Sequence, residues 1–343
     1  MIDSRVLIVD DSAIARQAVS RAIAVTPGMS VAGLAHNGQM GLERVAELSP
    51  DAVVLDLEMP VMDGLTFLRR VRTTHPRLPV VVFSSISRRG AEATLEAMNS
   101  GATAYVLKPS AVPGGAPTDT QTELIPVLQA VLRRPAGGSV PTLARASRTA
   151  VGAVVVAVST GGPTALNELL PALPGDLAIP VLVVQHMPAE FTTLLAKRLD
   201  SRCAVKVVEA TDGQPVTSAT VYLAPGGRHM EVAGTPDAPR IRLTDDPPVN
   251  SCRPAADVLF ESAARVAHSP LLAVVMTGMG NDGLRGARAV VAAGGSVIAQ
   301  DPATAVVGSM PTAVIEGGLA YAVLPVPGIA DEIVRRARGF RRP

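Results

Sequence analysis

Aromatic residues and cysteines are scarce in this sequence. Its 343 residues include no Trp, 3 Tyr and 5 Phe, too few for a platform that stacks nucleic-acid bases or for an aromatic cage around a cationic ligand. The two cysteines, Cys203 and Cys252, cannot form a disulfide framework or a four-cysteine zinc site, which fits a reducing compartment. Neither has a local nucleophile signature, so both are interpreted as buried or incidental.

An excess of charge of one sign is also missing. The 31 Lys and Arg residues are matched by 30 Asp and Glu residues, so no overall field attracts nucleic acid or a membrane surface. The longest uncharged apolar run, Thr149–Asn167, contains Ser-Thr-Gly-Gly-Pro, which would break a membrane helix. Residues 1–10 carry no leader pattern. We therefore expect a cytoplasmic monomer without membrane insertion or a nucleic-acid partner.

Glycine, proline and apolar residues are abundant. Apolar residues make up 48% of the chain, with 30 Gly and 29 Pro, which predicts a sizeable core built from many short elements. At roughly 100–200 residues per domain, the length indicates two domains. In residues 1–134, β-branched runs alternate with amphipathic patterns, which predicts an α/β domain around a parallel sheet. The expected strands are Val6–Val9, Met29–Ala35, Ala52–Leu55, Val80–Phe83 and Ala104–Leu107, and the expected helices are Ser12–Ala24, Gly38–Leu48, Leu65–Thr74, Gly90–Ser100 and Thr122–Arg134.

A linker is predicted after this domain. Residues 135–149 read PAGGSVPTLARASRT, a composition typical of a linker. The α/β rhythm then returns over residues 150–343, which predicts a second, doubly wound and mostly parallel domain. Its expected strands are Ala153–Val158, Pro180–Val184, Thr220–Leu223, Leu271–Met276 and Gly295–Ala299, with a hairpin around Glu231–Leu243.

Acidic residues end two strands of the first domain. Asp10 and Asp11 follow the first strand and Asp56 follows the third, and such carboxyl ends line one crevice of a doubly wound sheet. Three converging carboxylates would repel one another without a cation, and oxygen-only ligation suits Mg²⁺. Ser84 and Lys108 end the next two strands, so the set predicts a phosphoryl site with Asp56 as nucleophile. The alternative for any single Asp is a solvated cap or turn residue.

The motifs VLIVDDS, LDLEMPVMDG, VVFSS and AYVLKPS resemble those of two-component response-regulator receiver domains. The resemblance implies a flavodoxin-like sheet of order 2-1-3-4-5 in residues 1–134, phosphorylation of Asp56 by a histidine kinase, and a switch that senses the phosphoryl group. It also implies site residues with separate roles. The metal ligands would be Asp11, Asp56 and the backbone carbonyl of Glu58, with Asp10 behind them or binding through water, and the switch residues would be Ser84 and Tyr105 beside Lys108.

Three strand ends of the second domain carry a possible catalytic triad. In AVVVAVSTGGPTAL a strand is followed by a tight turn and a helix, which places Ser159 beside a helix N-terminus. A serine nucleophile needs a base, and the base needs an orienting acid. His186 follows the strand PVLVVQ, and Asp282 lies in TGMGNDG after the strand LLAVVM. The glycines of this last loop leave backbone N–H groups free to face an oxyanion, and the preferred one is that of Met279.

Each member of this set has an alternative interpretation. A loop such as the one at Ser159 is often no more than an anion-binding or capping turn. His229, in the glycine-rich APGGRHM, is a rival for the role of base, whereas His36, His75 and His268 are interpreted as loop residues. A domain that binds a partner and catalyses nothing is the competing class, but it would need no Ser, His and Asp at three strand ends.

The segments AVSTGGPTAL, VVQHMPAEFTTLLAKRL, VYLAPGGRHM, RPAADVLF, MTGMGNDG and IAQDPATAVVGSMP resemble the catalytic domain of chemotaxis protein-glutamate methylesterases. The resemblance implies hydrolysis of glutamyl γ-methyl esters on methyl-accepting chemotaxis receptors, with release of methanol, and deamidation of receptor glutamines, both in chemotaxis adaptation. It implies Ser159 as nucleophile, His186 as base and Asp282 as its orienter, with the Thr160 hydroxyl and the Met279 N–H near the oxyanion. No cofactor is expected for the hydrolase.

Some positions depart from the family pattern. Val158 precedes the serine where a small residue is usual, Ala255 replaces a common Ser, and Cys252 occupies a position that is commonly polar. Gly308-Ser309 stand before Met-Pro where an aromatic residue and Gly are usual. We expect none of them to touch the triad. A further hypothesis is that the unphosphorylated receiver covers the edge that carries Ser159 and that phosphorylation of Asp56 loosens this contact.

Overall fold

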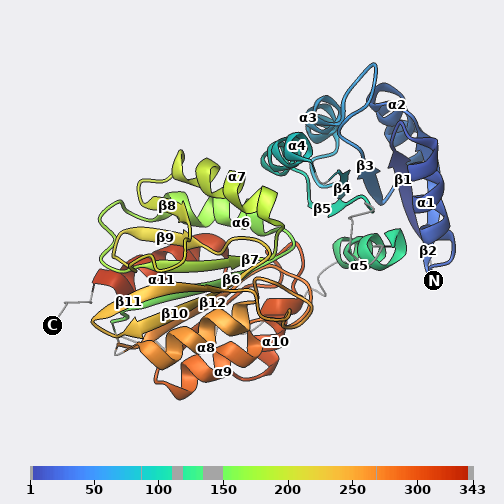
Figure 1. Ribbon diagram of the computed structural model, residues 1–343. Helices are drawn as coiled ribbons and strands as arrows, with labels where there is room; N and C mark the ends of the chain where they lie inside the picture. Colours follow the sequence, from blue (N-terminus) through green and yellow to red (C-terminus); the bar gives the residue numbers. More distant parts are fainter. Residues whose placement is uncertain (1–2, 86, 110–118, 134–149, 268, 339–343) are drawn as a thin grey trace. The chain divides into compact units, whose positions relative to one another are not determined.

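Two parallel sheets organise the chain, one in each of two units, residues 1–134 and 135–343 (Figure 1). The computed structural model describes residues 3–85, 87–109, 119–133, 150–267 and 269–338. The predicted linker, residues 135–149, lies outside the described residues, so the domain boundaries stay predictions. No helix within the described ranges is both long and apolar enough to span a bilayer.

The first unit confirms the predicted sheet. Its five strands are all parallel and run in the order β2-β1-β3-β4-β5. They are β1 (Ser4–Val9), β2 (Met29–Ala35), β3 (Ala52–Leu55), β4 (Val80–Ser84) and β5 (Ala104–Leu107). Helices α1 and α5 cover one face and α2, α3 and α4 the other, so the central strands are buried on both sides. The helices are α1 (Ala13–Ala24), α2 (Gly38–Leu48), α3 (Gly64–Thr74), α4 (Arg88–Asn99) and α5 (Thr120–Leu132).

Each of these five helices begins at a side chain of its own segment. The capping side chain accepts a hydrogen bond from a backbone N–H two or three residues later, which satisfies one of the unpaired donors of the first turn. The five capping residues are Ser12, Asn37, Asp63, Ser87 and Asp119. These caps set the helix starts within two residues of the predicted ones.

The second unit contains a seven-stranded, fully parallel sheet of order β14-β13-β12-β6-β7-β9-β8, as the doubly wound prediction requires. Its strands are β6 (Ala153–Val158), β7 (Val181–Gln185), β8 (Lys206–Glu209), β9 (Thr220–Leu223), β12 (Leu271–Val275), β13 (Ser296–Gln300) and β14 (Ala320–Leu324). The sequence prediction missed β8 and β14. Both are edge strands, where partial exposure weakens the buried apolar pattern.

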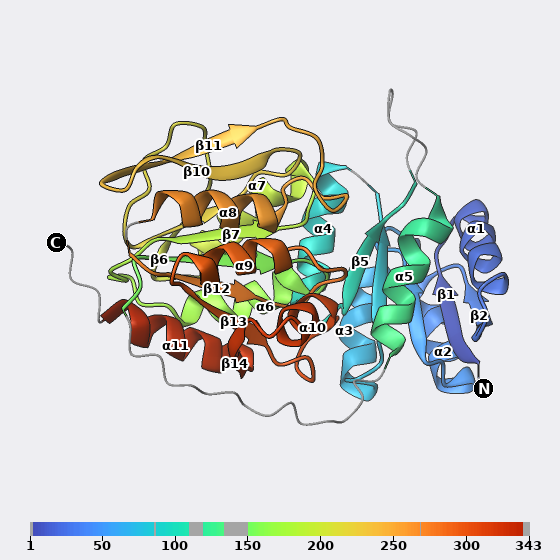
Figure 2. The same cartoon turned by 90° about the horizontal axis from the view of Figure 1, so that it is seen from below.

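Helices cover both faces of this sheet. Figure 1 shows α6, α7 and α11 on one face and α8, α9 and α10 on the other. They are α6 (Gly162–Leu169), α7 (Ala189–Asp200), α8 (Ala256–Val266), α9 (Leu284–Ala292), α10 (Ser309–Glu316) and α11 (Val326–Arg338). The predicted hairpin is present as β10 (His229–Thr235) and β11 (Ala238–Thr244), and β10 packs against α8 (Figure 2). In contrast to the first unit, none of α6 to α10 has a side-chain cap from its own N-cap residue.

Candidate functional site

The second unit has its candidate site at the point where the strand order reverses. Strand β6 lies between β12 and β7, and in open α/β sheets the crevice beyond the carboxyl ends at such a switch point is where ligands bind. Ser159 directly follows β6, His186 directly follows β7, and the loop that contains Asp282 follows β12. The fold therefore brings the three predicted residues to one edge.

Ser159 is held by close backbone packing. Its N–H donates to the Thr277 carbonyl (2.9 Å) and its carbonyl accepts from the Gly162 N–H (2.7 Å). Gly161 adopts a φ of +80°, which glycine tolerates without strain. A Cβ on Gly278 would lie 2.8 Å from the Ser159 Cβ, so the loop after β12 approaches the serine where only a glycine fits.

Gln185, at the end of β7, links the serine and histidine segments. Its side-chain amide donates to the Ser159 carbonyl (3.0 Å) and to the His186 carbonyl (3.1 Å), and the residue is 1% exposed. The sequence analysis missed this residue, although it belongs to the quoted run VVQHMP. A buried amide that bridges two strand ends fixes their spacing.

His186 and Asp282 form a tight, buried pair. The distance from His186 Nε2 to Asp282 Oδ2 is 2.7 Å, and the side chains are 13% and 2% exposed. Burial by itself would lower the pKa of His186, but the hydrogen bonds and charges of Asp282 and Cys252 outweigh it and raise this pKa to about 9. Although burial opposes ionisation of Asp282, His186 and nearby backbone N–H groups hold the pKa of its carboxyl below the usual value. Since Asp282 takes Nε2, the nitrogen that remains for proton transfer is Nδ1.

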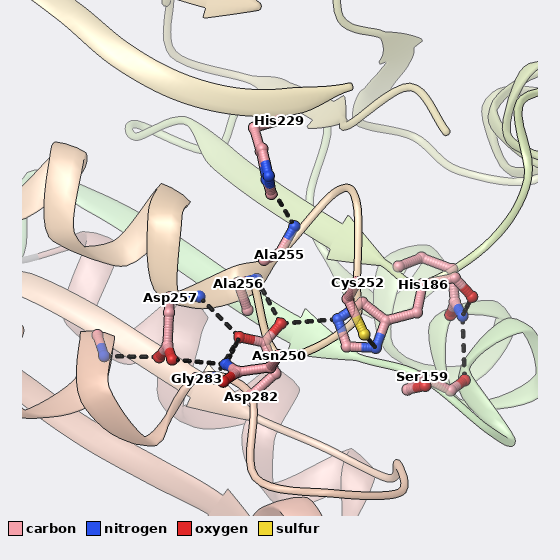
Figure 3. A network of polar contacts seen from close by, with 12 residues as sticks. Ser159, His186, His229, Asn250, Cys252, Ala255, Ala256, Asp257, Asp282 and Gly283 are labelled. Atoms are coloured by element: carbon pink, nitrogen blue, oxygen red, sulfur yellow. Dashed lines mark hydrogen bonds and ion pairs between the residues drawn. The ribbon is translucent and has the colours of Figure 1, made fainter. Parts of the chain in front are cut away.

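Asp282 accepts hydrogen bonds from five groups, and the residues that provide them surround it in Figure 3. Besides His186, these are the backbone N–H groups of Ala256 (2.6 Å), Asp257 (3.1 Å) and Gly283 (3.1 Å) and the Asn250 side-chain amide (3.0 Å). Ala256 and Asp257 are the first residues of α8, so the helix N-terminus stabilises the carboxylate. This donor set keeps Asp282 ionised and oriented.

Cys252 lies against His186, the predicted base, contrary to the expectations that this cysteine is buried or incidental and that none of the departures touches the triad. Its Sγ is 3.6 Å from His186 Nδ1, the one ring nitrogen that Asp282 leaves over. The expectation was wrong because the contact comes from a turn far away in the sequence, and no local pattern around Cys252 signals it. The other cysteine, Cys203, has a pKa raised to about 11 by burial and by Asp200.

The remaining predicted residues of this site lie in the loops that follow β6 and β12. Ser159 and Thr160 are half-buried, and the Thr160 carbonyl accepts from the Thr277 hydroxyl (2.8 Å). Met279 is 41% exposed and lies next to Gly278, which abuts Ser159. The oxyanion roles of the Thr160 hydroxyl and the Met279 N–H stay predictions.

The rival base, His229, is engaged elsewhere. It is 1% exposed, its Nδ1 accepts from the Ala255 N–H (3.2 Å), and its Nε2 lies 3.1 Å from the Pro247 carbonyl. Because Nδ1 is an acceptor, Nε2 carries the proton and donates it to Pro247. Both nitrogens are therefore occupied by backbone, which leaves His229 without a free acceptor for a serine proton.

The first unit gathers its predicted acidic residues at the carboxyl ends of β1 and β3. Carboxylate oxygens of Asp10, Asp11 and Asp56 lie within 4.8 Å of one another, with Asp10 and Asp56 buried. Lys108 Nζ contacts Asp10 Oδ2 (2.9 Å) and Asp56 Oδ1 (3.0 Å). Burial raises the pKa of Asp56, and Lys108 offsets this only in part. Three carboxylates facing one ammonium leave a deficit of positive charge that a divalent cation fits, so the cluster is typical of a receiver Mg²⁺ and phosphorylation site.

Of the predicted switch residues, Ser84 ends β4 and Tyr105 lies within β5. The buried Ser84 hydroxyl accepts from the Thr94 hydroxyl (2.7 Å), and Tyr105 is half-buried on β5. The Glu58 side chain is exposed and lies 3.5 Å from Arg89. The switch roles, and the Glu58 carbonyl as a metal ligand, stay predictions.

Comparisons with known proteins identify the family of each unit. Residues 154–333 match the CheB methylesterase family and residues 6–113 match the response regulator receiver domain. A protein-glutamate methylesterase/protein-glutamine glutaminase of a Nocardioides species is 45% identical over 97% of this chain and 95% of its own length. One from Caulobacter vibrioides is 44% identical over 97% and 99%. The crystal structure of the Thermotoga maritima CheB methylesterase catalytic domain is 42% identical, with a TM-score of 0.53, and covers 54% of this chain and 97% of that domain.

Proposed function

Because this chain belongs to the CheB methylesterase family and carries a receiver domain, we propose that Ser159, His186 and Asp282 perform its ester hydrolysis and that Asp56 controls it. The chain is a protein-glutamate methylesterase/protein-glutamine glutaminase of chemotaxis adaptation. The observation that carries the assignment of residues is the His186–Asp282 pair at 2.7 Å, on strand ends that adjoin the one bearing Ser159.

In the first step the Ser159 hydroxyl oxygen attacks the γ-carbonyl carbon of a glutamyl methyl ester. His186 takes the hydroxyl proton on Nδ1, while Asp282 holds Nε2–H and stabilises the imidazolium. The tetrahedral intermediate expels methanol, which receives the proton from His186, and an acyl-serine remains. Water then attacks the acyl carbon with His186 again as base, and the proton passes from His186 to the Ser159 oxygen as the receptor glutamate side chain leaves with a free carboxylate. A glutamine amide follows the same steps with ammonia as the leaving group.

The negative oxygen of the tetrahedral intermediate needs donors on the open side of the serine. We assign them to the Met279 N–H and the Thr160 hydroxyl. Their support is the close approach of Gly278 to Ser159, because Met279 follows Gly278 directly and Thr160 follows Ser159 directly. Removing one such donor typically costs on the order of 10²–10³ in rate.

The receiver accepts its phosphoryl group from a histidine kinase, and the esterase acts on chemoreceptors. We propose Asp56 as the acceptor, Lys108 as the group that neutralises a phosphoryl oxygen, and Ser84 with Tyr105 as the switch. Asp10, Asp11, Asp56 and the Glu58 carbonyl would hold Mg²⁺, which when bound neutralises charge on the phosphoryl group. The hydrolase needs no cofactor in this scheme, and its proposed form is a cytoplasmic monomer without a nucleic-acid partner.

The test compares the full-length wild type with Ser159→Ala and Asp56→Ala. Methanol release from membranes containing methylated receptors is measured with and without a phosphodonor. Ser159→Ala should abolish release under both conditions, and Asp56→Ala should keep basal release but lose stimulation. Normal release by Ser159→Ala would refute the nucleophile, and undiminished stimulation of Asp56→Ala would refute the phosphorylation site.

A further inference from the structure

Asp282 depends on one side chain besides the base. Three of its five donors are backbone N–H groups, and the fourth is His186. The fifth is Asn250, whose Nδ2 lies 3.0 Å from Asp282 Oδ1. Substitution can alter this last contact without touching His186 or the helix backbone.

Asn250 is itself anchored by a second buried carboxylate. The same Nδ2 donates to Asp257 Oδ2 (2.9 Å), and Asp257 is 3% exposed. The other oxygen of Asp257 accepts from the Gly286 N–H (2.7 Å) in the first turns of α9. The two hydrogens of one amide group thus satisfy two carboxylates, and Figure 3 shows Asn250 between them.

A two-residue turn presents this amide. Val249 and Cys252 exchange both backbone hydrogen bonds (3.0 and 2.9 Å), and the two residues between them, Asn250 and Ser251, have φ values of 52° and 61°. Such a turn needs two left-handed residues, and asparagine tolerates that conformation well. One turn therefore brings Asn250 to Asp282 and Cys252 to His186.

We propose that Asn250, anchored by Asp257, is a positioning residue of the esterase. Its amide fixes the orientation of the Asp282 carboxylate and offsets part of the negative charge that this carboxylate exerts on His186. The proposal rests on the proposed function, because it presumes that His186 is the base. When the amide donor is lost, more of the charge of Asp282 falls on the imidazolium, which is then harder to deprotonate. When the Asp257 charge is lost, one like charge leaves the cluster and the imidazolium is easier to deprotonate.

Other charged and titratable groups near Asp282 and Asp257 could also change how readily His186 loses its proton. Cys252 faces His186 Nδ1 at 3.6 Å, and Arg285 Nε approaches Asp257 Oδ2 at 4.0 Å. Burial raises the pKa of Asp257, and the Asp282 charge raises it further. Asn250 is exposed as a residue, so its replacement leaves the core unchanged.

The experiment measures the pH dependence of kcat/KM for methanol release in the full-length chain. Asn250→Ala should lower kcat about tenfold, the effect of one hydrogen bond to a charged group, and should move the acid limb of the profile to higher pH. Asp257→Asn should move that limb to lower pH. Ser251→Gly is the matched control, because it keeps the same turn and its side chain is in none of the contacts of the described network.

Opposite shifts by Asn250→Ala and Asp257→Asn support the proposal, because a purely structural defect would lower kcat and the melting temperature without moving the limb in either direction. A wild-type profile and kcat for Asn250→Ala overturns it, even if Asp257→Asn fails to fold. Ser159→Ala is assayed alongside. If Ser159→Ala is inactive while Asn250→Ala behaves as wild type, this inference alone fails, and an active Ser159→Ala means that the proposed function has failed.

Discussion

The two units solve the same problem, the start of a helix, in different ways. In the receiver, each helix is capped by a side chain two or three residues before the backbone group that it binds, such as Asp63 on the Thr66 N–H at 2.7 Å. In the hydrolase, the first turn of α8 is bound by Asp282 from 25 residues or more away, and an N–H of α9 is bound by Asp257. The receiver helices are therefore capped locally, whereas α8 and α9 of the hydrolase depend on the buried carboxylates of Asp282 and Asp257.

The two acidic sites differ in the same sense. In the receiver, carboxylate oxygens of three residues lie within 4.8 Å of one another and face one lysine. This excess of negative charge suits a cation that accompanies a phosphoryl group. The hydrolase surrounds Asp282 with five donors, an arrangement that fixes one charge in one orientation. Asp282 thus holds the start of α8 as well as His186. The backbone donors of the receiver carboxylates are instead local, the Ser12 N–H for Asp10 and the Leu57 N–H for Asp56.

The largest expected effect is for Asp282, which contacts His186 and also caps α8. Asp282→Asn should lower kcat/KM by about 10³–10⁴, since the base loses its orienting charge. It should also lower the hydrolase melting temperature, because the α8 cap weakens by about 1 kcal/mol. Asp63→Ala removes a cap of similar size in the receiver and should destabilise that unit by a similar amount with basal esterase activity unchanged. Methanol release and thermal unfolding of both variants measure the difference. Equal losses of esterase activity in Asp282→Asn and Asp63→Ala would contradict this difference between the two units.

The next effect concerns pH. Since the base must be neutral and the pKa of His186 is raised to about 9, kcat/KM should rise about tenfold per pH unit up to that value and then level off. Cys252 contributes to the raised pKa, so Cys252→Ala should move the limb to lower pH and increase activity at pH 7. Cys203→Ala, which alters a cysteine away from the base, is the control. An unshifted limb in Cys252→Ala would mean that the thiol does not influence the base.

A smaller loss is expected at the bridge between strand ends. Gln185→Leu removes the donor to the Ser159 and His186 carbonyls and should lower kcat about tenfold with KM nearly constant, because positioning rather than binding is lost. Steady-state kinetics on methylated receptors, with thermal unfolding to check the fold, measure this. A change in KM alone would assign Gln185 to substrate binding instead.

The local character of the receiver explains how much of it could be predicted. Its three central strands, β1, β3 and β4, are buried runs rich in β-branched residues. Its caps, such as Ser12 and Asn37, stand in the sequence beside the helices that they start. In the hydrolase, β6, β7 and β12 were predicted for the same reason. The edge strands β8 and β14 were not, because their half-exposed residues lack a continuous apolar pattern.

The candidate site divides along the same line. Ser159, His186 and Asp282 could be brought together from sequence because each follows a buried parallel strand and such ends share one edge. Asn250 and Cys252 could not, because they reach the site from a two-residue turn whose placement is set by tertiary contacts. The pair Asn-Ser favours a turn, but nothing in its sequence says that this turn faces a carboxylate.

The smallest expected effect concerns the excess negative charge at the receiver site. Because burial raises the pKa of Asp56 and Lys108 offsets this only partly, the ionised carboxylate is less favourable in the folded state than in the unfolded chain. Stability therefore falls as the pH rises through the Asp56 pKa, and at neutral pH Asp56→Asn should raise the receiver melting temperature by roughly 4 °C in the presence of a chelator.

Addition of Mg²⁺ should stabilise the wild type more than Asp56→Asn, because the variant has lost a ligand and a repulsive charge at once. Thermal unfolding of the full-length chain reports both units, and the hydrolase transition, whose carboxylate is already saturated by donors, should not respond to Mg²⁺. If Mg²⁺ raised the melting temperatures of both transitions equally, the excess negative charge at the receiver site would not explain the response.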